Sequence, residues 1–209
     1  MNEFVSRAII QRQGRPSSQG ASPDGDQENA WVSASRRGDT GAFNRLVLKW
    51  EKTIFNIALR MLRDRDEAAE ATQEIFLMAY QGIRRFRHDS RFSTWLYRIA
   101  VNNCLTRVKQ RPPGIRISLE TDGQAVSPAP QLRVAENQSG HVMQQEQRYR
   151  VIAAMSHLPP EQHVVIELKF FQERTFEEIA AILDVPLSTI KSRLYAGLEM
   201  LKTRLGSEA

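Results

Sequence analysis

The stretch TFEEIAAILDVPLSTIKSRLYAGLEMLKTRL, residues 175–205, contains the most specific pattern in this chain of 209 residues. A first apolar helical pattern ends at LDVP, where Asp184 can take the left-handed conformation of a tight turn. In the second pattern, Ile190, Leu194 and Leu198 recur every four residues and therefore share one face of a helix. Two helices joined by a tight turn are typical of a helix-turn-helix.

The outward face of the second helix carries the residue types that a recognition helix uses. A helix that enters the major groove of DNA needs short polar and basic side chains on the outer face of its N-terminal half. The candidates for DNA contacts are Ser188, Thr189, Lys191, Ser192, Arg193 and Tyr195. Residues 187–205 contain four basic residues and one acidic residue, a net charge of +3. We interpret the stretch as a DNA-binding helix-turn-helix, and the alternative is an ordinary antiparallel helix pair with a solvated basic face.

Further helical patterns precede this motif. One spans about residues 144–157 and ends at LPPE, because Leu158 stands before a proline and is disfavoured in a helix. Pro160 suits the first turn of the next helix. In TFEE, Thr175 and Glu178 have the spacing of a capping box, which marks the start of the helix-turn-helix.

Two segments lack the apolar content that folding requires. Residues 11–29 consist mostly of Gly, Ser, Pro, Gln and Asn, so burial cannot offset their ordering entropy, and we expect residues 1–27 to be a disordered extension. Residues 111–140 contain RPPG, SPAP and NQSG and are expected to form a flexible linker. The predicted fold is all-α, with two small helical domains at residues 28–110 and 141–209, the second of which contains the helix-turn-helix.

The N-terminal domain is predicted to contain four helices, and no convincing strand pattern is present. A short helix covers about residues 31–36. Asp39 can cap a long second helix, whose apolar residues recur every three or four positions. Asp64, in DRDE, begins a third helix, and a fourth spans about residues 92–109. The predicted buried positions of the third helix are Ala68, Ala71, Ile75, Met78 and Ala79.

The fourth helix carries an unusual mixture of side chains in RFSTWLYRIAVNN, residues 91–103. At about 100° per residue, the predicted core stripe consists of Phe92, Leu96, Ile99 and Asn103. The neighbouring stripe consists of Trp95, Arg98 and Asn102. Aromatic and guanidinium planes stack on unpaired bases, and an amide can bond a base edge. This second stripe is a candidate site for separated DNA strands, whereas the alternative assigns Trp95 to the core and Asn102 to the solvated surface.

Charge is distributed unevenly over the same domain. Residues 64–74 contain five acidic residues and one arginine, a net charge of −4. Residues 84–116 contain nine basic residues and one acidic residue, a net charge of +8. An acidic helix followed by a basic region suggests two partners, one basic and one polyanionic. The alternative for the acidic run is an ordinary solvated helix.

Other functional classes find little support in the sequence. Cys104 is the only cysteine, so no internal disulfide can form, and we interpret it as an apolar filler, with a redox sensor as the alternative. The four histidines lack metal-ligand spacing, and no nucleophile–base pair or phosphate-binding glycine loop is present. We therefore expect no cofactor, no metal and no enzymatic activity. No apolar run approaches the roughly 18 residues of a membrane span, which favours a cytoplasmic protein without membrane insertion.

Three stretches together resemble a bacterial RNA polymerase sigma factor of the extracytoplasmic-function (ECF) class. They are RRGDTGAFNRLV, EAAEATQEIFLMAYQGIRRFRHDSRFSTWLYRIAVNN and LPPEQHVVIELKFFQERTFEEIAAILDVPLSTIKSRLYAGLEMLK. The resemblance runs from about Trp31 to Leu205. It implies that the N-terminal domain binds core polymerase and opens the minus-ten promoter element, and that the C-terminal domain binds the minus-thirty-five element.

The resemblance also implies roles for particular residues. The third helix would dock on the clamp coiled coil of the largest polymerase subunit, and the second subunit's flap would also be a partner. The residues implied in that docking are Asp66, Glu67, Gln73, Glu74 and Phe76, and the alternative for Phe76 is a place in the core. The residues implied near the minus-ten element are Phe86, Arg87, His88, Asp89, Ser90, Arg91, Trp95, Arg98 and Asn102. ECF members are often held inactive by a dedicated anti-sigma protein, which the sequence does not identify.

The sequence departs from the family pattern at two positions. His88 stands where many members have glycine, and Ala196 stands where some carry a basic residue. The main competing hypothesis is a conventional helix-turn-helix regulator with an N-terminal partner-binding or ligand-binding domain. Such a regulator would bind duplex DNA without polymerase.

Overall fold

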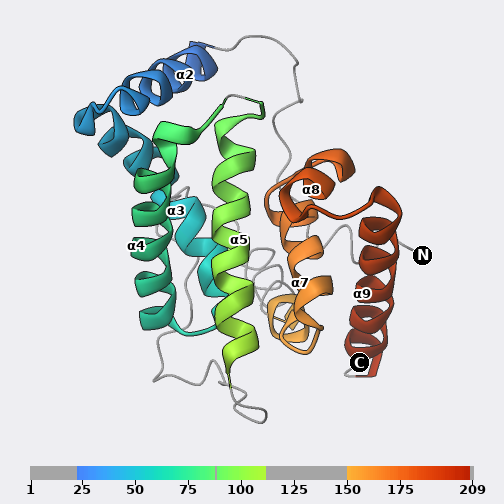
Figure 1. Cartoon of the computed structure of the whole chain (residues 1–209). Coiled ribbons are helices and arrows are strands. Elements are labelled where there is room, and N and C mark those ends of the chain that lie inside the picture. Colours follow the sequence, from blue (N-terminus) through green and yellow to red (C-terminus); the bar gives the residue numbers. More distant parts are fainter. Residues whose placement is uncertain (1–22, 88, 112–149, 208–209) are drawn as a thin grey trace, which may run out of the picture.

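The computed structural model describes residues 23–87, 89–111 and 150–207, which form helices and connecting turns with no strand among them. The predicted all-α fold is confirmed for these residues. Figure 1 shows two groups of helices side by side, α2 to α5 and α7 to α9. Residues 1–22 of the expected extension, residues 112–140 of the expected linker and residues 144–149 of an expected helix lie outside the described residues. No helix in the described part is long and apolar enough to cross a membrane.

The N-terminal group is organised around one long central helix. Its elements are α2 (Pro23–Arg36), α3 (Thr40–Leu62), α4 (Arg65–Gly82), the 3₁₀ turn η1 (Ile83–Arg85) and α5 (Phe92–Gln110). Helix α3 packs against α2, α4 and α5, and its apolar face is buried along its length. The four helices predicted for this domain are all present.

Two aspartates begin the two central helices, as the sequence predicts. The Asp39 side chain accepts a hydrogen bond from the Ala42 backbone N–H over 3.0 Å. The Asp64 side chain accepts one from the Glu67 backbone N–H over 2.7 Å. Each carboxylate satisfies a backbone donor that would otherwise have no partner within the helix.

Helix α2 begins earlier than predicted. It starts at Pro23 rather than near residue 31, so the prediction of disorder is wrong for residues 23–27. Proline suits the first position of a helix because that position needs no backbone N–H donor. Glu28 pairs with Lys49 of α3 over 2.7 Å, and Val32 is fully buried. The polar composition of residues 23–27 predicted disorder, but these residues begin a helix that packs one face against the core.

The C-terminal group contains the predicted helix-turn-helix. Residues 150–155 are helical, and α7 (Pro160–Ile166) continues into a π-helical segment, η2 (Glu167–Phe171). Helices α8 (Phe176–Leu183) and α9 (Leu187–Ser207) form the motif itself.

The local signals of the motif are confirmed. Thr175 and Glu178 make both hydrogen bonds of the capping box, over 3.1 and 2.9 Å. Asp184 occupies the left-handed region with φ 56°. The side chains of Ile190 and Leu194 are buried, as predicted, and Leu198 packs partly buried against the same core.

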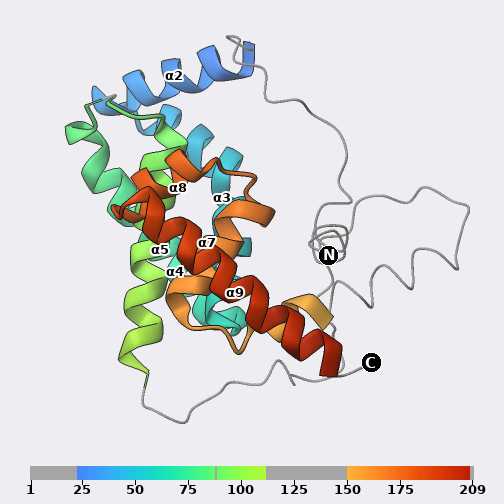
Figure 2. The same ribbon diagram turned by 90° about the vertical axis from the view of Figure 1, so that its right-hand side faces the viewer.

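A glycine allows α9 to approach α7 closely. A Cβ atom on Gly197 would lie 2.8 Å from Ile166 Cδ1 and 3.3 Å from Gln162 Cβ. Ile166 is fully buried and has little room to move. This contact fixes the rotation of α9, which crosses in front of the other helices in Figure 2.

Cys104 is a core residue of α5. Its side chain is fully buried, and burial raises the pKa of the thiol to about 12. The thiolate is the reactive form of cysteine, so this side chain is poorly suited to redox chemistry. The interpretation of Cys104 as an apolar filler agrees with this environment.

We predict that Gly197→Ala destabilises the protein although alanine is the better helix former. Over-packing a tight site costs about 1–3 kcal/mol, which exceeds the gain of up to about 1 kcal/mol in helix propensity. Gly206→Ala is the control, because no atom lies within 4 Å of its added Cβ. Urea unfolding should show a lower free energy of unfolding for Gly197→Ala than for Gly206→Ala. Equal values for the two variants would contradict the close contact.

Candidate DNA and partner surfaces

The outer surface of α4 differs from the one predicted. Asp66, Gln73 and Glu74 are exposed, as a docking surface requires. Phe76 is only 8% exposed, which agrees with the alternative that assigns it to the core. The exposed apolar side chains of this surface are instead Leu77 at 56% and Met78 at 44%, neither of which was among the predicted docking residues.

The structure buries Phe76 and exposes Met78, whereas the sequence analysis predicted Met78 to be buried. With Ala68, Ala71, Ile75 and Ala79 on the buried stripe, Phe76 and Met78 lie on opposite flanks, about 95° and 65° from its centre. The helical pattern alone therefore favours burial of Met78 over Phe76. In the folded domain, Met78 lies beside α5, where its sulfur is 3.9 Å from Asn103 Nδ2. Packing against neighbouring helices therefore decides which flank is covered.

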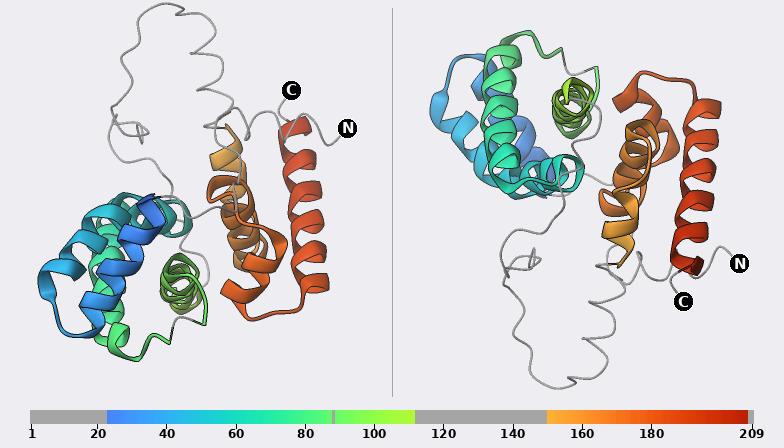
Figure 3. Two further views of the ribbon diagram at one scale, coloured as in Figure 1. Left: turned by 90° about the horizontal axis from the view of Figure 1, so that it is seen from above. Right: turned by 90° about the horizontal axis from the view of Figure 1, so that it is seen from below.

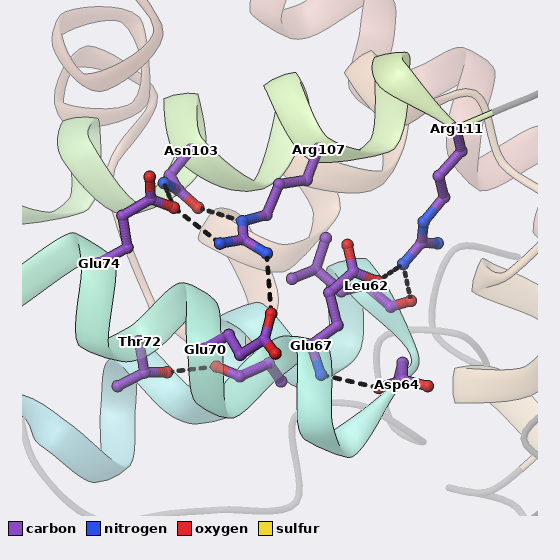
Figure 4. A network of polar contacts seen from close by, with 10 residues as sticks. Leu62, Asp64, Glu67, Glu70, Thr72, Glu74, Asn103, Arg107 and Arg111 are labelled. Carbon is purple, nitrogen blue, oxygen red and sulfur yellow. Dashed lines mark hydrogen bonds and ion pairs between the residues drawn. The ribbon is translucent and has the colours of Figure 1, made fainter.

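A polar network joins the acidic helix α4 to the basic helix α5 (Figure 4). Glu74 accepts hydrogen bonds from Asn103 over 2.9 Å and from Arg107 over 2.7 Å. These two donors, Asn103 first, lower the pKa of the Glu74 carboxyl. Arg111 pairs with Glu67. Part of the acidic run and part of the basic region thus neutralise each other within one domain. Asn103 was predicted to lie in the core, but it is half-buried and belongs to this polar network.

Three aromatic rings support the loop between η1 and α5. Phe86 packs against Phe92 and Trp95, with ring centroids 6.1 and 5.2 Å apart. Phe86 is only 5% exposed, so its ring lies beneath the loop surface rather than on it. Trp95 is half-buried and covers Gly82, where a Cβ atom would lie 3.1 Å from the indole ring. This agrees with the alternative that assigned Trp95 in part to the core.

The loop itself is polar and exposed. Its exposed members are Arg87, Asp89, Ser90 and Arg91. His88 lies outside the described residues. The aromatic cluster beneath the loop holds its two ends at the start of α5. The polar side chains therefore project from a rigid base.

The stripe of α5 that was predicted to contact DNA faces the helix-turn-helix. Asn102 and Arg98 are both exposed. The Arg98 guanidinium forms an ion pair of 2.9 Å with Asp184, at the turn between α8 and α9. The core stripe of α5 includes Tyr97, which sequence analysis missed. The Tyr97 hydroxyl donates a hydrogen bond to Gln172 over 3.2 Å, and burial raises its pKa to about 12.

The outer face of α9 carries the predicted polar set. Its exposed members are Ser188, Lys191, Ser192 and Tyr195, whereas Thr189 and Arg193 are half-buried. The Ser192 hydroxyl donates a hydrogen bond to the Thr189 carbonyl over 3.0 Å, so part of its hydrogen-bonding capacity is used within the helix. Because Ile190 and Leu194 point into the core, the basic face must point outward.

Sequence analysis missed a buried ion pair between the two helical groups. Arg60 donates two hydrogen bonds of 2.6 Å to the two carboxylate oxygens of Glu167. Glu167 is fully buried and also accepts a hydrogen bond from Gln172 over 3.0 Å. Part of the signal was present, because Arg60 is the single charge in IALRML, whereas VVIELKFF carries Glu167 and Lys169 among apolar residues.

Comparisons with known proteins place both domains. Residues 46–112 match the family model of Sigma-70 region 2, and residues 148–201 match that of Sigma-70 region 4. The RNA polymerase sigma-H factor of Pseudomonas aeruginosa is 32% identical over 183 residues, which cover 86% of this chain and 94% of the relative. The chain belongs to the ECF class of bacterial RNA polymerase sigma factors.

Further relatives and solved structures agree with this assignment. The ECF sigma-E factor of Escherichia coli K12 is 32% identical over 178 residues, which cover 83% of this sigma factor and 92% of the relative. The fold is similar to that of CnrH, solved in complex with the cytosolic domain of CnrY, with a TM-score of 0.64 and 16% identity over 88% of this chain and all of the other. RpoE of Bartonella quintana in complex with NepR gives a TM-score of 0.58, with 20% identity over 80% of this chain and 98% of the other. A sigma factor binds core RNA polymerase and directs promoter-specific initiation, as the sequence analysis expected.

We predict that Phe76 and Leu77 contribute very differently to the free energy of unfolding. Phe76→Ala removes a buried ring and should lower the free energy of unfolding by about 3–5 kcal/mol. Leu77→Ala removes an exposed side chain and should change it by less than about 0.5 kcal/mol. Both values can be measured by denaturant unfolding. A loss of stability in Leu77→Ala as large as that in Phe76→Ala would contradict the placement of the two side chains.

Proposed function

We propose that this sigma factor uses three separate surfaces during initiation. The outer surface of α4 binds core polymerase, the exposed stripe of α5 with the preceding loop holds the separated minus-ten element, and the outer face of α9 binds the minus-thirty-five element. The observation that carries this proposal is the placement of polar and basic side chains on outward faces of two domains whose apolar faces are packed into cores. Figure 3 shows α4 and α9 on opposite sides of the molecule, with α5, α7 and α8 between them.

The polymerase surface on α4 combines charge with apolar area. Asp66, Gln73 and Glu74 supply polar contacts, and Leu77 and Met78 supply exposed apolar area on the same helix. Interfaces depend on a few apolar anchors that are surrounded by polar contacts. We assign this surface to the clamp coiled coil of the largest subunit, and the C-terminal domain to the flap of the second subunit. Phe76 contributes by holding the helix in place.

The minus-ten surface is polar and basic. Arg87, Arg91 and Arg98 offer guanidinium groups to phosphates or to unpaired bases, and Asn102 offers an amide to a base edge. The buried ring of Phe86 and the half-buried ring of Trp95 position this surface from beneath. We therefore assign Asn102 a role in base preference and the arginines a role in holding the open strand.

The minus-thirty-five surface lies at the N-terminal half of α9. Ser188, Lys191 and Ser192 face outward where a recognition helix meets the major groove. Lys191 is steadied by the ring of Phe176, whose centroid lies 5.9 Å from its amino group. Arg193 and Tyr195 flank this set on the next turn. Phosphate contacts by the basic residues position the helix, and polar contacts to bases give specificity.

Regulation by a protein inhibitor fits the same class. CnrH and the Bartonella quintana RpoE were each solved in complex with a partner, CnrY and the anti-sigma factor NepR respectively. We propose that an anti-sigma factor also controls this chain, that the response concerns stress or the cell envelope, and that the protein acts in the bacterial cytoplasm with the polymerase. The proposed activity is that of an initiation factor and not of an enzyme.

Run-off transcription tests the proposed function. Purified core polymerase, with and without this protein, is given a library of promoter fragments, and the transcripts are sequenced. We expect discrete start sites that appear only when the protein is present. If the protein instead binds duplex DNA tightly without polymerase and produces no specific transcript, the competing hypothesis of a conventional helix-turn-helix regulator holds.

We predict that Asn102→Ala and Lys191→Ala fail at different steps. Asn102→Ala should reduce permanganate reactivity of the minus-ten thymines and relax base preference at one position, because amide contacts carry base identity. Lys191→Ala should weaken promoter binding by the holoenzyme while leaving strand opening intact once the complex has formed. If Lys191 binds a phosphate, the slope of log affinity against log salt falls by about 1. Wild-type behaviour of both variants would contradict the assigned surfaces.

A further inference from the structure

A buried histidine lies where the two helical groups meet. His163 belongs to α7, which packs against α3, and only 5% of its surface is exposed. Two positive charges from the N-terminal group act on its ring, Arg63 at the end of α3 and Arg60 within it. The Nε2 atom of His163 is buried and has no hydrogen-bond partner among the described residues. None of the surfaces assigned to DNA or polymerase uses this side chain.

Both arginines are fixed beside the histidine and keep their charge. Arg60 donates two hydrogen bonds to Glu167, and the Arg63 guanidinium donates one to the Ser156 carbonyl. Arginine stays protonated throughout the pH range of folded proteins. The single carboxylate of Glu167 therefore already stands against two positive charges, and a proton on His163 would add a third in the same buried space.

The ionisable groups of η2 and α5 have other partners or are neutral. Glu167 of η2 is bonded to Arg60. Lys109 of α5 pairs with Glu161 of α7 over 3.5 Å. The thiol of Cys104 in α5 is neutral, because burial raises its pKa to about 12.

The remaining neighbours of α7 are apolar or exposed. In the segment before α7, Arg150 and His157 are exposed, and the His157 ring is bonded to the Ser156 hydroxyl over 2.9 Å. Helix α9 packs against α7 and buries apolar residues, which are Ile190, Leu194, Gly197 and Leu201. The groups that act on a protonated His163 are therefore chiefly the two arginines.

The environment of His163 strongly disfavours its protonated form. Burial lowers the pKa of His163, and the charges of Arg63 and Arg60 lower it further, to about 3. A histidine in water has a pKa of about 6.5. Because the pKa is lower in the packed state than in the separated one, the ring binds its proton by separating, and a fall in pH weakens the packing. The stabilisation is complete above about pH 6.5 and is lost as the pH falls toward 3.

We propose that His163 is an acid-sensitive switch in the contact between the two helical groups. Below about pH 6.5 the ring takes up a proton only where water reaches it, so protonated chains have α7 separated from α3. Separation also breaks the ion pair of 2.9 Å between Arg98 and Asp184. The effect on transcription rests on the proposed function, in which Arg98 is one of the groups assigned to the open DNA strand.

Single-molecule energy transfer in the free protein measures this response. Cysteines at the exposed positions Gln81 in α4 and Thr203 in α9 carry a donor and an acceptor dye. The buried Cys104 remains, and its lack of labelling is verified in the chain without added cysteines. A fall from pH 7.5 to pH 5.5 should lower the ratio of high-transfer to low-transfer molecules about tenfold, because one protonation with a reference pKa of about 6.5 is linked to separation. Ordinary carboxyl groups, with pKa values near about 4, stay ionised in this range.

Two variants and one matched control separate this ring from other titrating groups. His163→Gln and His163→Met both remove the titrating ring, and methionine suits a site where Nε2 has no partner. The control His157→Gln removes the exposed histidine of the segment before α7. In each His163 variant that keeps the wild-type helix content by circular dichroism, we expect the ratio to change less than about twofold with pH. The control should keep the full response.

Three results would overturn the proposal. They are a wild-type ratio that is the same at both pH values, a response that persists in a folded His163 variant, and a response that disappears in His157→Gln. Loss of helix content in the wild type between the two pH values would also overturn it, because acid would then unfold the chain instead of separating its two groups. If neither His163 variant folds, the wild type and the His157→Gln control still decide. None of these measurements includes polymerase or DNA, so a failure here leaves the proposed function intact, and run-off transcription tests that function separately.

Discussion

A single buried carboxylate governs how the two halves of this sigma factor meet. Glu167 is fully buried where α7 continues into the π-helical segment η2, and a buried charge needs a charged partner with good hydrogen-bond geometry. Arg60 meets that need from α3, the central helix of the N-terminal group. The position of the C-terminal group follows from this requirement, and with it the facing of α5 toward α8 and the placement of α4 and α9 at opposite surfaces.

Features that depend on a few neighbouring residues could be predicted from the sequence. The caps at Asp39 and Asp64, the capping box at Thr175 and the left-handed turn at Asp184 each follow from the chemistry of one side chain and the backbone next to it. The rotation of α9 was also predictable, because its buried aliphatic residues recur at helical spacing. These local rules were sufficient for the fold class and for the outward face of the recognition helix.

Features that depend on distant partners could not be predicted in the same way. Helical periodicity placed Met78 nearer than Phe76 to the centre of the buried stripe, and only the neighbouring helices bury Phe76 and expose Met78. The net charges of the two segments overstated the charge that α4 and α5 leave available to partners, because Glu74 accepts hydrogen bonds from Asn103 and Arg107 of the facing helix. Arg60 and Glu167, 107 positions apart, gave only the signal of charges placed within apolar runs.

We propose that one protein places two DNA-binding surfaces on two promoter elements at the same time, and photocrosslinking of the holoenzyme on a promoter tests this placement. A photoreactive amino acid replaces Asn102 in one protein and Lys191 in another, and the crosslinked bases are mapped on both strands. We expect crosslinks at the minus-ten element from position 102 and at the minus-thirty-five element from position 191, about 25 base pairs apart. Crosslinks from both positions to one element, or from neither position to promoter DNA, would contradict it.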